Sequence, residues 1–236
     1  MPRFIAVPTH ADLPARALAA SGDHPDRLRA VVHASLLPLK FLVVFFHELS
    51  HALMAIATGG SVESFSVNFQ QGGEVWTRGG SRFLTLTAGY LGSLLIGAGV
   101  LLAALHSRMD RAILGGIGVL MLAVLVLYVR DLAAIVICGL TGAALIAASR
   151  YLREGACDLI LRVIGLSSLI YVPYDIWDDT IRRADLGSDA RMLAEEIGGT
   201  TMIWGGLWFL LSLAVIAWCL SRGLGRDSNL HLGPRR

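Results

Sequence analysis

Long apolar runs constrain the fold of this chain more than any other feature of its sequence. Several of them reach the length of about 18–20 residues that a helix needs to cross a lipid bilayer. Hydrophobic residues make up 55% of the chain and charged residues only 16%, whereas soluble domains carry about 25% charged residues. The sequence therefore predicts an all-α polytopic membrane protein.

The apolar runs divide the chain into about six transmembrane helices. Residues 112–149 would form one helix of about 57 Å, which is too long for a single crossing, and Arg130-Asp131 interrupts this run. A membrane-embedded domain over 36–220 is then flanked by polar tails at 1–35 and 221–236. The six expected spans cover residues 36–58, 83–105, 112–129, 132–149, 159–177 and 202–220.

The distribution of positive charge predicts the orientation of these spans. An even number of spans places both tails on one side of the membrane, and that side carries thirteen Lys and Arg residues against six on the other. The positive-inside rule then makes both tails cytosolic, and we expect the membrane to be a bacterial cytoplasmic membrane. The net charge of +2 is too small to suggest a nucleic-acid partner. The three cysteines lack metal-site spacing, so we expect neither a disulfide nor a cysteine metal site.

A short polar segment between the first two spans has the pattern of a β-hairpin. Phe65, Val67 and Phe69 alternate with polar residues, which is the period of a strand. Gly72-Gly73 is typical of a turn, and residues 74–78 would form the returning strand.

The second span contains Gly89, Ser93 and Gly97 at four-residue intervals. Small residues at this spacing form a smooth helix face on which another helix can pack closely.

The first span carries His47, Glu48 and His51 inside an apolar run. A helix turns ~100° per residue, so the two imidazoles project from nearly the same face and can reach one ion. Zn²⁺ suits such nitrogen ligands. In sites with this His-Glu-x-x-His spacing the glutamate is not a ligand and takes a proton from a zinc-bound water. A polar cluster that only hydrogen-bonds neighbouring helices is the structural alternative, but ionisable residues inside a span are usually functional.

A third metal ligand is expected from the end of the fifth span. The histidines outside the motif lie in the tails or at span ends, whereas Asp175, Asp178 and Asp179 share one helical face. The first and fifth spans run in the same direction, so the end of the fifth matches His51 in depth. Asp175 is the deepest of the three and is the predicted ligand, with Asp178 or Asp179 as alternatives or as partners that orient a ligating imidazole.

Two further polar groups have structural interpretations. Asp158 and Arg162 are spaced as an i, i+4 pair and are expected to neutralise each other. Ser188-Asp189-Ala190, ahead of Glu195-Glu196, has the pattern of a helix cap followed by a solvated face.

Taken together, these features resemble the site-2 protease family of intramembrane zinc metalloproteases, and in particular its compact M50B-like branch. The similarity covers residues from about 36 to 220. It is carried by the His47–His51 motif, by Ala88-Gly89-Tyr90-Leu91-Gly92-Ser93, and by residues 174–179 followed by 188–190. The resemblance implies Zn²⁺ on His47 and His51, Glu48 as general base, and hydrolysis of peptide bonds in or beside the membrane.

The chain also departs from the pattern of the better-studied members of that family. Those members supply an aspartate from a Leu-Asp-Gly sequence with Asn and Pro upstream. Here Pro173 precedes Asp175, but no Leu-Asp-Gly with a preceding Asn occurs. The resemblance therefore identifies neither the third ligand nor a group that stabilises the oxyanion.

These observations favour a zinc-dependent endopeptidase that acts on membrane-anchored proteins. The alternative is a non-catalytic zinc-binding membrane protein that retains or transports a partner or a metal. The hairpin has two possible roles as well. A strand edge near residues 64–70 could hold an unwound substrate segment by β-addition, or the hairpin could only plug the helix bundle.

Overall fold

The computed structural model describes residues 23–182 and 187–223 of the chain. Internal contacts divide the chain into two units, Met1–Pro38 and Leu39–Arg236. The first unit contributes to the described residues only the beginning of helix α2 (Asp23–Ala57). Most of the two predicted tails, residues 1–22 and 224–236, lies outside the described residues.

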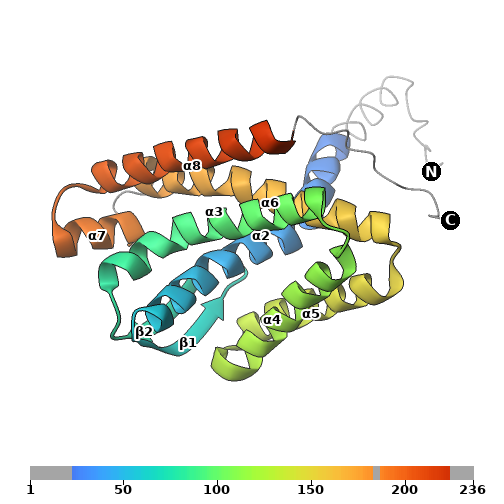
Figure 1. Ribbon diagram of the computed structural model, residues 1–236, viewed down its shortest axis with the longest axis horizontal. Coiled ribbons are helices and arrows are strands. Elements are labelled where there is room, and N and C mark those ends of the chain that lie inside the picture. The colour runs from blue at the N-terminus through green and yellow to red at the C-terminus, as the bar shows by residue number, and fades with distance from the viewer. Residues whose placement is uncertain (1–22, 183–186, 224–236) are drawn as a thin grey trace, which may run out of the picture. The chain divides into compact units, whose positions relative to one another are not determined.

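Helices dominate the described residues, and the predicted fold class is confirmed. A two-stranded hairpin follows α2, and a π-helical segment, Asp178–Arg182, continues helix α6 (Glu154–Trp177). The other elements are β1 (Ser61–Val67), β2 (Gly73–Arg78), α3 (Arg82–His106), α4 (Asp110–Tyr128), α5 (Leu132–Tyr151), α7 (Asp189–Ile197) and α8 (Thr201–Gly223) (Figure 1).

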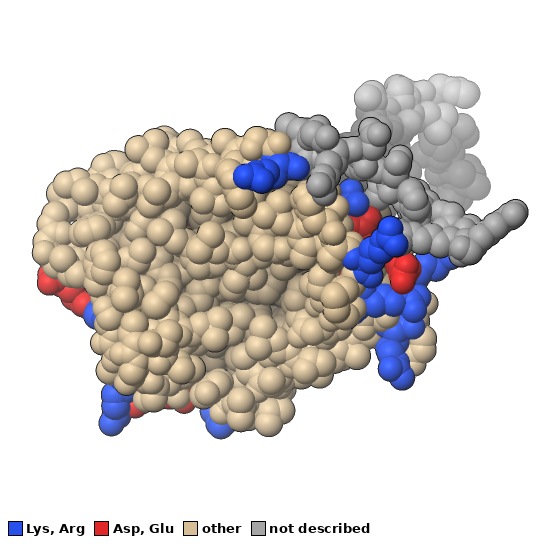
Figure 2. Space-filling view, in the orientation of Figure 1, with Lys and Arg blue, Asp and Glu red and all other residues tan. Residues whose placement is uncertain are grey.

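Six helical segments of the described residues are long and apolar enough to cross a membrane. Figure 2 shows one face on which Lys, Arg, Asp and Glu gather toward the two ends, with a wide uncharged area between them. This distribution suits a protein whose middle lies in hydrocarbon. The segments are Leu37–Ala57, Arg82–His106, Asp110–Tyr128, Leu132–Tyr151, Glu154–Arg182 and Thr201–Arg222.

The predicted break between the third and fourth spans is confirmed. Helix α4 ends at Tyr128 and α5 begins at Leu132. Asp131 is the N-cap of α5, and its side chain accepts a hydrogen bond of 2.8 Å from the backbone N–H of Ala134. This bond satisfies one of the amides that the first turn of a helix leaves without a partner.

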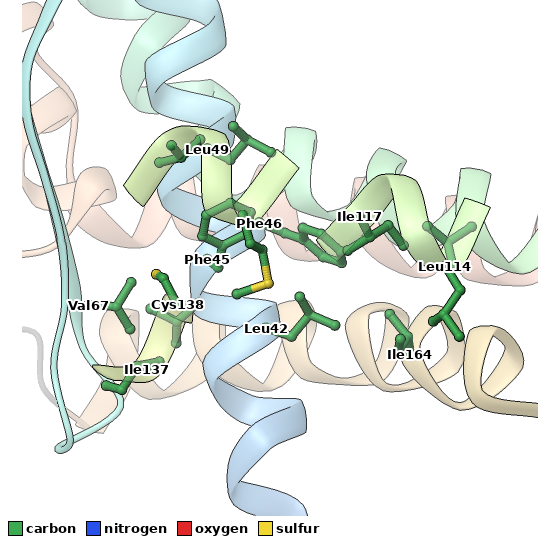
Figure 3. Close-up of a cluster of buried hydrophobic side chains, with 14 of the residues drawn as sticks. Leu42, Phe45, Phe46, Leu49, Val67, Leu114, Ile117, Ile137, Cys138 and Ile164 are labelled. Carbon is green, nitrogen blue, oxygen red and sulfur yellow. The ribbon is translucent and has the colours of Figure 1, made fainter. Parts of the chain in front are cut away.

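The hairpin is attached to the protein interior through β1. Strands β1 and β2 pair antiparallel, as the alternating pattern predicted. Phe65 and Val67 are buried, and β1 packs against α4 and α5. Figure 3 shows Val67 beside Phe45 of α2 and Cys138 of α5 in one hydrophobic cluster. The hairpin is therefore fixed on one side by core packing.

Helices α3 and α6 pack closely because glycines remove side chains from their contact. A Cβ on Gly97 of α3 would collide with Ser168 of α6. A Cβ on Gly165 of α6 would lie 2.7 Å from Leu101 of α3. The smooth face predicted for the second span is therefore used as expected.

A second hydrophobic cluster joins the short helix α7 to α3, α6 and α8. Leu193 of α7 is buried together with Tyr90 of α3, Ile176 of α6 and Trp208 of α8. Since α7 packs on both α3 and α8, its first residue reaches the interior of the helix bundle.

Candidate metal centre

Three side chains that are suited to bind a metal converge near the C-terminal end of α2. The Nε2 atoms of His47 and His51 each lie 3.1 Å from Oδ2 of Asp189. The ligand atoms of the three residues all lie within 4.8 Å of one another. As the helical spacing predicted, the two imidazoles share one face of α2, with ring centroids 4.8 Å apart.

Asp189 reaches the histidines because it is the first residue of α7. Ser188 caps this helix and accepts a hydrogen bond from the N–H of Arg191, so the predicted cap is confirmed. The solvated face that we predicted after it holds for Glu195 and Glu196. The interpretation was wrong for Asp189, which is only 7% exposed and faces the histidines.

The second nitrogen of His51 is held by the backbone. Its Nδ1 lies 2.7 Å from the carbonyl oxygen of Thr85. Because a carbonyl can only accept, Nδ1 donates its proton to Thr85, and Nε2 is the nitrogen that faces Asp189. Histidines that bind metals usually have such a partner on the other nitrogen.

His47 is held in a different way, by the ring of Tyr90. The two rings meet edge to face with centroids 4.8 Å apart. The hydroxyl of Tyr90 donates a hydrogen bond of 2.5 Å to Oδ2 of Asp179, and the Tyr90 ring also packs on Trp208. Residues of α3, α8 and the π-helical segment therefore fix the orientation of Tyr90.

Helix α3 approaches the three ligands with a glycine. A Cβ on Gly89 would lie 2.5 Å from Nε2 of His51 and 2.5 Å from Oδ2 of Asp189. Even the smallest side chain at this position would therefore displace the ligand atoms.

The charge of Asp189 is stabilised by its two neighbours. Burial disfavours the charged carboxylate, but the imidazoles of His51 and His47 outweigh burial and hold the pKa of Asp189 well below its usual range. A carboxylate kept ionised in a buried place is suited to bind a cation.

Glu48 lies beside the ligands and against the hairpin. The side chain is 6% exposed. A Cβ on Gly73, the first residue of β2, would lie 2.6 Å from Oε1 of Glu48. The beginning of β2 therefore touches the carboxylate that the sequence predicts to be the base.

The site opens into a cavity of about 700 Å³. One wall is formed by α2, with His47, Glu48 and His51. Residues 72–77, from the turn and β2, form a second wall, and α3, α6 and α7 close the rest. The cavity is therefore large enough for a segment of peptide beside the candidate ligands.

The structure brings Asp189, and not Asp175, into the group of ligand atoms. Asp175 lines the same cavity, but its carboxylate does not belong to the group of ligand atoms. Oδ1 of Asp178 lies 3.6 Å from Nη1 of Arg182, and Oδ2 of Asp179 accepts the hydrogen bond from the Tyr90 hydroxyl.

A signal for Asp189 was present in the sequence. Asp189 and Leu193 are one helical turn apart, so an apolar Leu193 indicates that Asp189 lies on the buried face of α7. The other predicted polar pair is confirmed, since Nε of Arg162 lies 2.7 Å from Oδ1 of Asp158.

The donor set fits a catalytic zinc ion. Such sites use three protein ligands drawn from imidazole nitrogens and carboxylate oxygens, and this group supplies two nitrogens and one oxygen. The hydrogen bond from His51 to the Thr85 carbonyl holds the imidazole in place, as is usual for histidines that bind metals.

Fold and site thus define an integral membrane protein with a buried group of side chains that could hold a metal ion. A family model described as Peptidase M50B-like matches residues 28–219. The chain belongs to this family of intramembrane metalloproteases. Comparison with curated proteins and comparison with solved structures gave no match.

Proposed function

We propose that the protein is a zinc-dependent intramembrane endopeptidase that hydrolyses peptide bonds of membrane-anchored proteins. The observation that supports this most directly is the convergence of Nε2 of His47, Nε2 of His51 and Oδ2 of Asp189, with Glu48 lining the same cavity. A metal-transport or retention role would leave a buried Glu48 beside this group without a task.

We assign His47, His51 and Asp189 as the ligands of Zn²⁺. Asp189 replaces Asp175 as our choice because its Oδ2 belongs to the group of ligand atoms, whereas Asp175 only lines the cavity.

Zn²⁺ in this group would polarise the substrate carbonyl and make a water molecule acidic enough to attack it near neutral pH. Glu48 accepts a proton from the attacking water. The same carboxyl later gives this proton to the nitrogen of the departing amine, so Glu48 ends the cycle unprotonated. Tyr90 and the Thr85 carbonyl keep the two imidazoles in their orientations.

The substrate must present an extended segment, because a transmembrane helix keeps its carbonyls in its own hydrogen bonds. Strand β1 is paired with β2 and packs against α4 and α5, so we do not retain the predicted docking edge near residues 64–70. We infer that β2 is the better edge. It has no second strand among the described residues, it lines the cavity, and Gly73 touches Glu48.

We keep the predicted orientation, with both tails cytosolic in a bacterial cytoplasmic membrane. The excess of Lys and Arg on the side of the termini supports it. In this orientation the hairpin and the C-terminal end of α6 lie toward the opposite side of the membrane.

Glu48→Gln is the decisive variant for the proposed reaction. The amide keeps the size of the side chain but cannot take a proton from water, so hydrolysis should fall at least about 10³-fold. Zinc content should stay at one ion per chain, because Glu48 is not in the ligand group. The measurement is cleavage of a quenched-fluorescent transmembrane peptide by the purified, zinc-loaded protein, with zinc determined by elemental analysis.

His47→Ala is the matched control, and it should lose both zinc and activity. Cleavage by Glu48→Gln at the wild-type rate would exclude Glu48 as the base. Stoichiometric zinc in a wild-type protein that cleaves none of a library of transmembrane peptides would favour the retention role.

A further inference from the structure

The strand residue Gly73 lacks a side chain although its backbone does not require a glycine. Gly73 is the first residue of β2, and its φ lies outside the left-handed region. Glycine weakens a strand, because it adds no side chain to the packing and loses more backbone entropy than other residues. A glycine in a strand often marks a place where another group approaches the backbone closely.

The group that approaches Gly73 is the side chain of Glu48. A Cβ on Gly73 would lie 2.5 Å from Cγ, 2.6 Å from Oε1 and 2.8 Å from Cδ of Glu48. An alanine at position 73 would therefore come roughly 1 Å closer to Glu48 than an ordinary contact between carbon atoms allows. Either the strand or the glutamate would have to move.

The strand is held firmly at this point. Gly73 is paired with Val67 of β1. Val67 is fully buried in the hydrophobic cluster that includes Cys138 of α5 (Figure 3). Next to this pair, the N–H of Asn68 donates a hydrogen bond of 2.9 Å to the carbonyl oxygen of Gly72 and closes the hairpin. Glu48 is therefore the group that would have to give way.

The contact with Gly73 limits where the Glu48 carboxylate can lie. Glu48 is buried between its own helix and β2, and it lines the cavity beside His47 and His51. The missing side chain at position 73 gives the carboxylate a place against β2, outside the group of ligand atoms. A base in a His-Glu-x-x-His motif must stay off the metal in order to take a proton from water.

A second glycine approaches a different part of the same motif. A Cβ on Gly89 of α3 would meet His51 and Asp189, which are candidate ligands. A Cβ on Gly73 of β2 would meet the candidate base instead. The same substitution at the two glycines therefore separates metal binding from proton transfer.

We propose that Gly73 is a positioning residue for the reaction, because the space that it leaves keeps the Glu48 carboxylate where it takes the proton from the attacking water. This inference rests on the proposed endopeptidase function and gives the hairpin a task in catalysis as well as in docking. Gly73 acts through Glu48 and exchanges no proton itself. Displacement of a catalytic group by about 1 Å can cost about 10²-fold in rate.

Gly73→Ala tests the proposal. We expect kcat to fall about 10²-fold, and KM to change by less than about 3-fold, because the lost interaction acts in the transition state. Zinc content should stay at one ion per chain, since Glu48 is outside the ligand group. The full-length, zinc-loaded protein is assayed on the transmembrane peptide used for Glu48→Gln, and zinc is determined by elemental analysis.

A double-mutant cycle with Glu48→Asp shows whether the loss acts through the glutamate. Aspartate is one methylene shorter, so its carboxylate withdraws from position 73 by roughly 1.5 Å. Glu48→Asp alone should lower kcat about 10-fold to 10²-fold, because the carboxylate is displaced. Adding Gly73→Ala to Glu48→Asp should then lower kcat by less than about 3-fold more, whereas independent effects would multiply.

Two other alanine substitutions are the matched controls. Gly99→Ala in α3 adds a methyl group that meets no atom of the described residues within 4 Å. It should leave kcat, KM and zinc content unchanged. Gly89→Ala, whose methyl group meets the ligand atoms, should lower zinc affinity.

Three results would overturn the positioning role of Gly73 while leaving the endopeptidase intact. One is an unchanged kcat in Gly73→Ala. Another is a loss of activity that lies entirely in KM or in zinc content, which would indicate substrate docking or a disturbed metal site. The third is the same loss from Gly73→Ala in the Glu48→Asp protein as in the wild type, which would indicate a distorted strand. Absence of cleavage by the wild type would instead remove the proposed function, and the inference with it.

Discussion

Helices α2 and α3 differ from α4 and α5 in what they bury. In the membrane-spanning windows, 61% of α2 and 56% of α3 are buried inside the protein, against 28% of α4 and 22% of α5. The first pair buries polar side chains in its interior, among them Glu48, His51 and Thr85. In α4 and α5 the buried polar side chain is Asp110, the first residue of α4.

The difference shows how a site with charged groups can exist at membrane depth. Ionisable side chains are costly in hydrocarbon, so the helices that carry them must be shielded by others. Helices α4 and α5 pack on each other and on β1, and they present exposed apolar residues such as Val126 and Leu140. We therefore regard α2 and α3 as the inner, functional pair and α4 and α5 as the outer, supporting pair.

Among the variants that compare these regions, the largest loss of zinc affinity is expected from Asp189→Ala. The substitution removes a carboxylate from the ligand group. Loss of a residue that only orients a ligand costs up to about 100-fold in metal affinity. Loss of a ligand should cost more, so zinc affinity should fall by more than about 100-fold. Equilibrium competition with a fluorescent zinc chelator measures the affinity. Asp175→Ala should stay within about 10-fold of the wild type, since Asp175 is outside the group.

Asp131→Ala is the control in the outer pair. It removes the N-cap of α5 and should cost about 1 kcal/mol of stability without changing zinc affinity. If Asp175→Ala loses zinc and Asp189→Ala retains it, the ligand assignment is reversed and Asp175 is the third ligand after all.

Gly89→Ala tests the close approach of α3 to the ligands. The added methyl group would meet Nε2 of His51 and Oδ2 of Asp189, and we expect a loss of zinc affinity of about 10-fold to 100-fold, as for disturbance of an outer partner. Gly116→Ala in α4 is the matched control, because a Cβ there meets no atom within 4 Å. It should leave zinc affinity unchanged and stabilise α4 by about 0.5–1 kcal/mol.

The same Gly→Ala change thus tests one helix of the inner pair and one helix of the outer pair. Isothermal titration with Zn²⁺ and thermal unfolding in detergent would report both effects. Equal zinc affinity in the two variants would mean that α3 does not confine the ligands.

Local patterns were sufficient to predict the spans, the hairpin and the pair of histidines. Apolar length, the two-residue alternation before Gly72 and the four-residue spacing of His47 and His51 are all properties of a single segment. Each of them acts through short-range geometry, so no knowledge of the tertiary fold was needed.

The third ligand could not be obtained in the same way. Asp189 is separated from His47 by 142 positions, and their meeting depends on α7 packing against α3 and α8. Sequence reasoning favoured a carboxylate inside a span over one at the start of a short helix between spans.

The smallest effect on zinc affinity is expected at Tyr90, which packs on the ring of His47 and donates its hydroxyl proton to Asp179. Tyr90→Phe keeps the edge-to-face contact with His47 but loses the bond to Asp179. We expect zinc affinity to fall about 10-fold, which is the smallest loss usually seen when a residue that orients a metal ligand is changed. The visible spectrum of the Co²⁺-substituted protein should shift as well, because the His47 ring becomes less well oriented.

A double-mutant cycle shows whether Tyr90 and Asp179 act as one unit. If they do, the variant with both Tyr90→Phe and Asp179→Ala should be no weaker in zinc binding than the weaker single variant. Tyr128→Phe, at the end of α4, is the control in the outer pair and should change neither affinity nor spectrum. Additive losses from Tyr90→Phe and Asp179→Ala would show that the two residues support the site independently. Tyr90 would then orient His47 through its ring alone and not through its bond to Asp179.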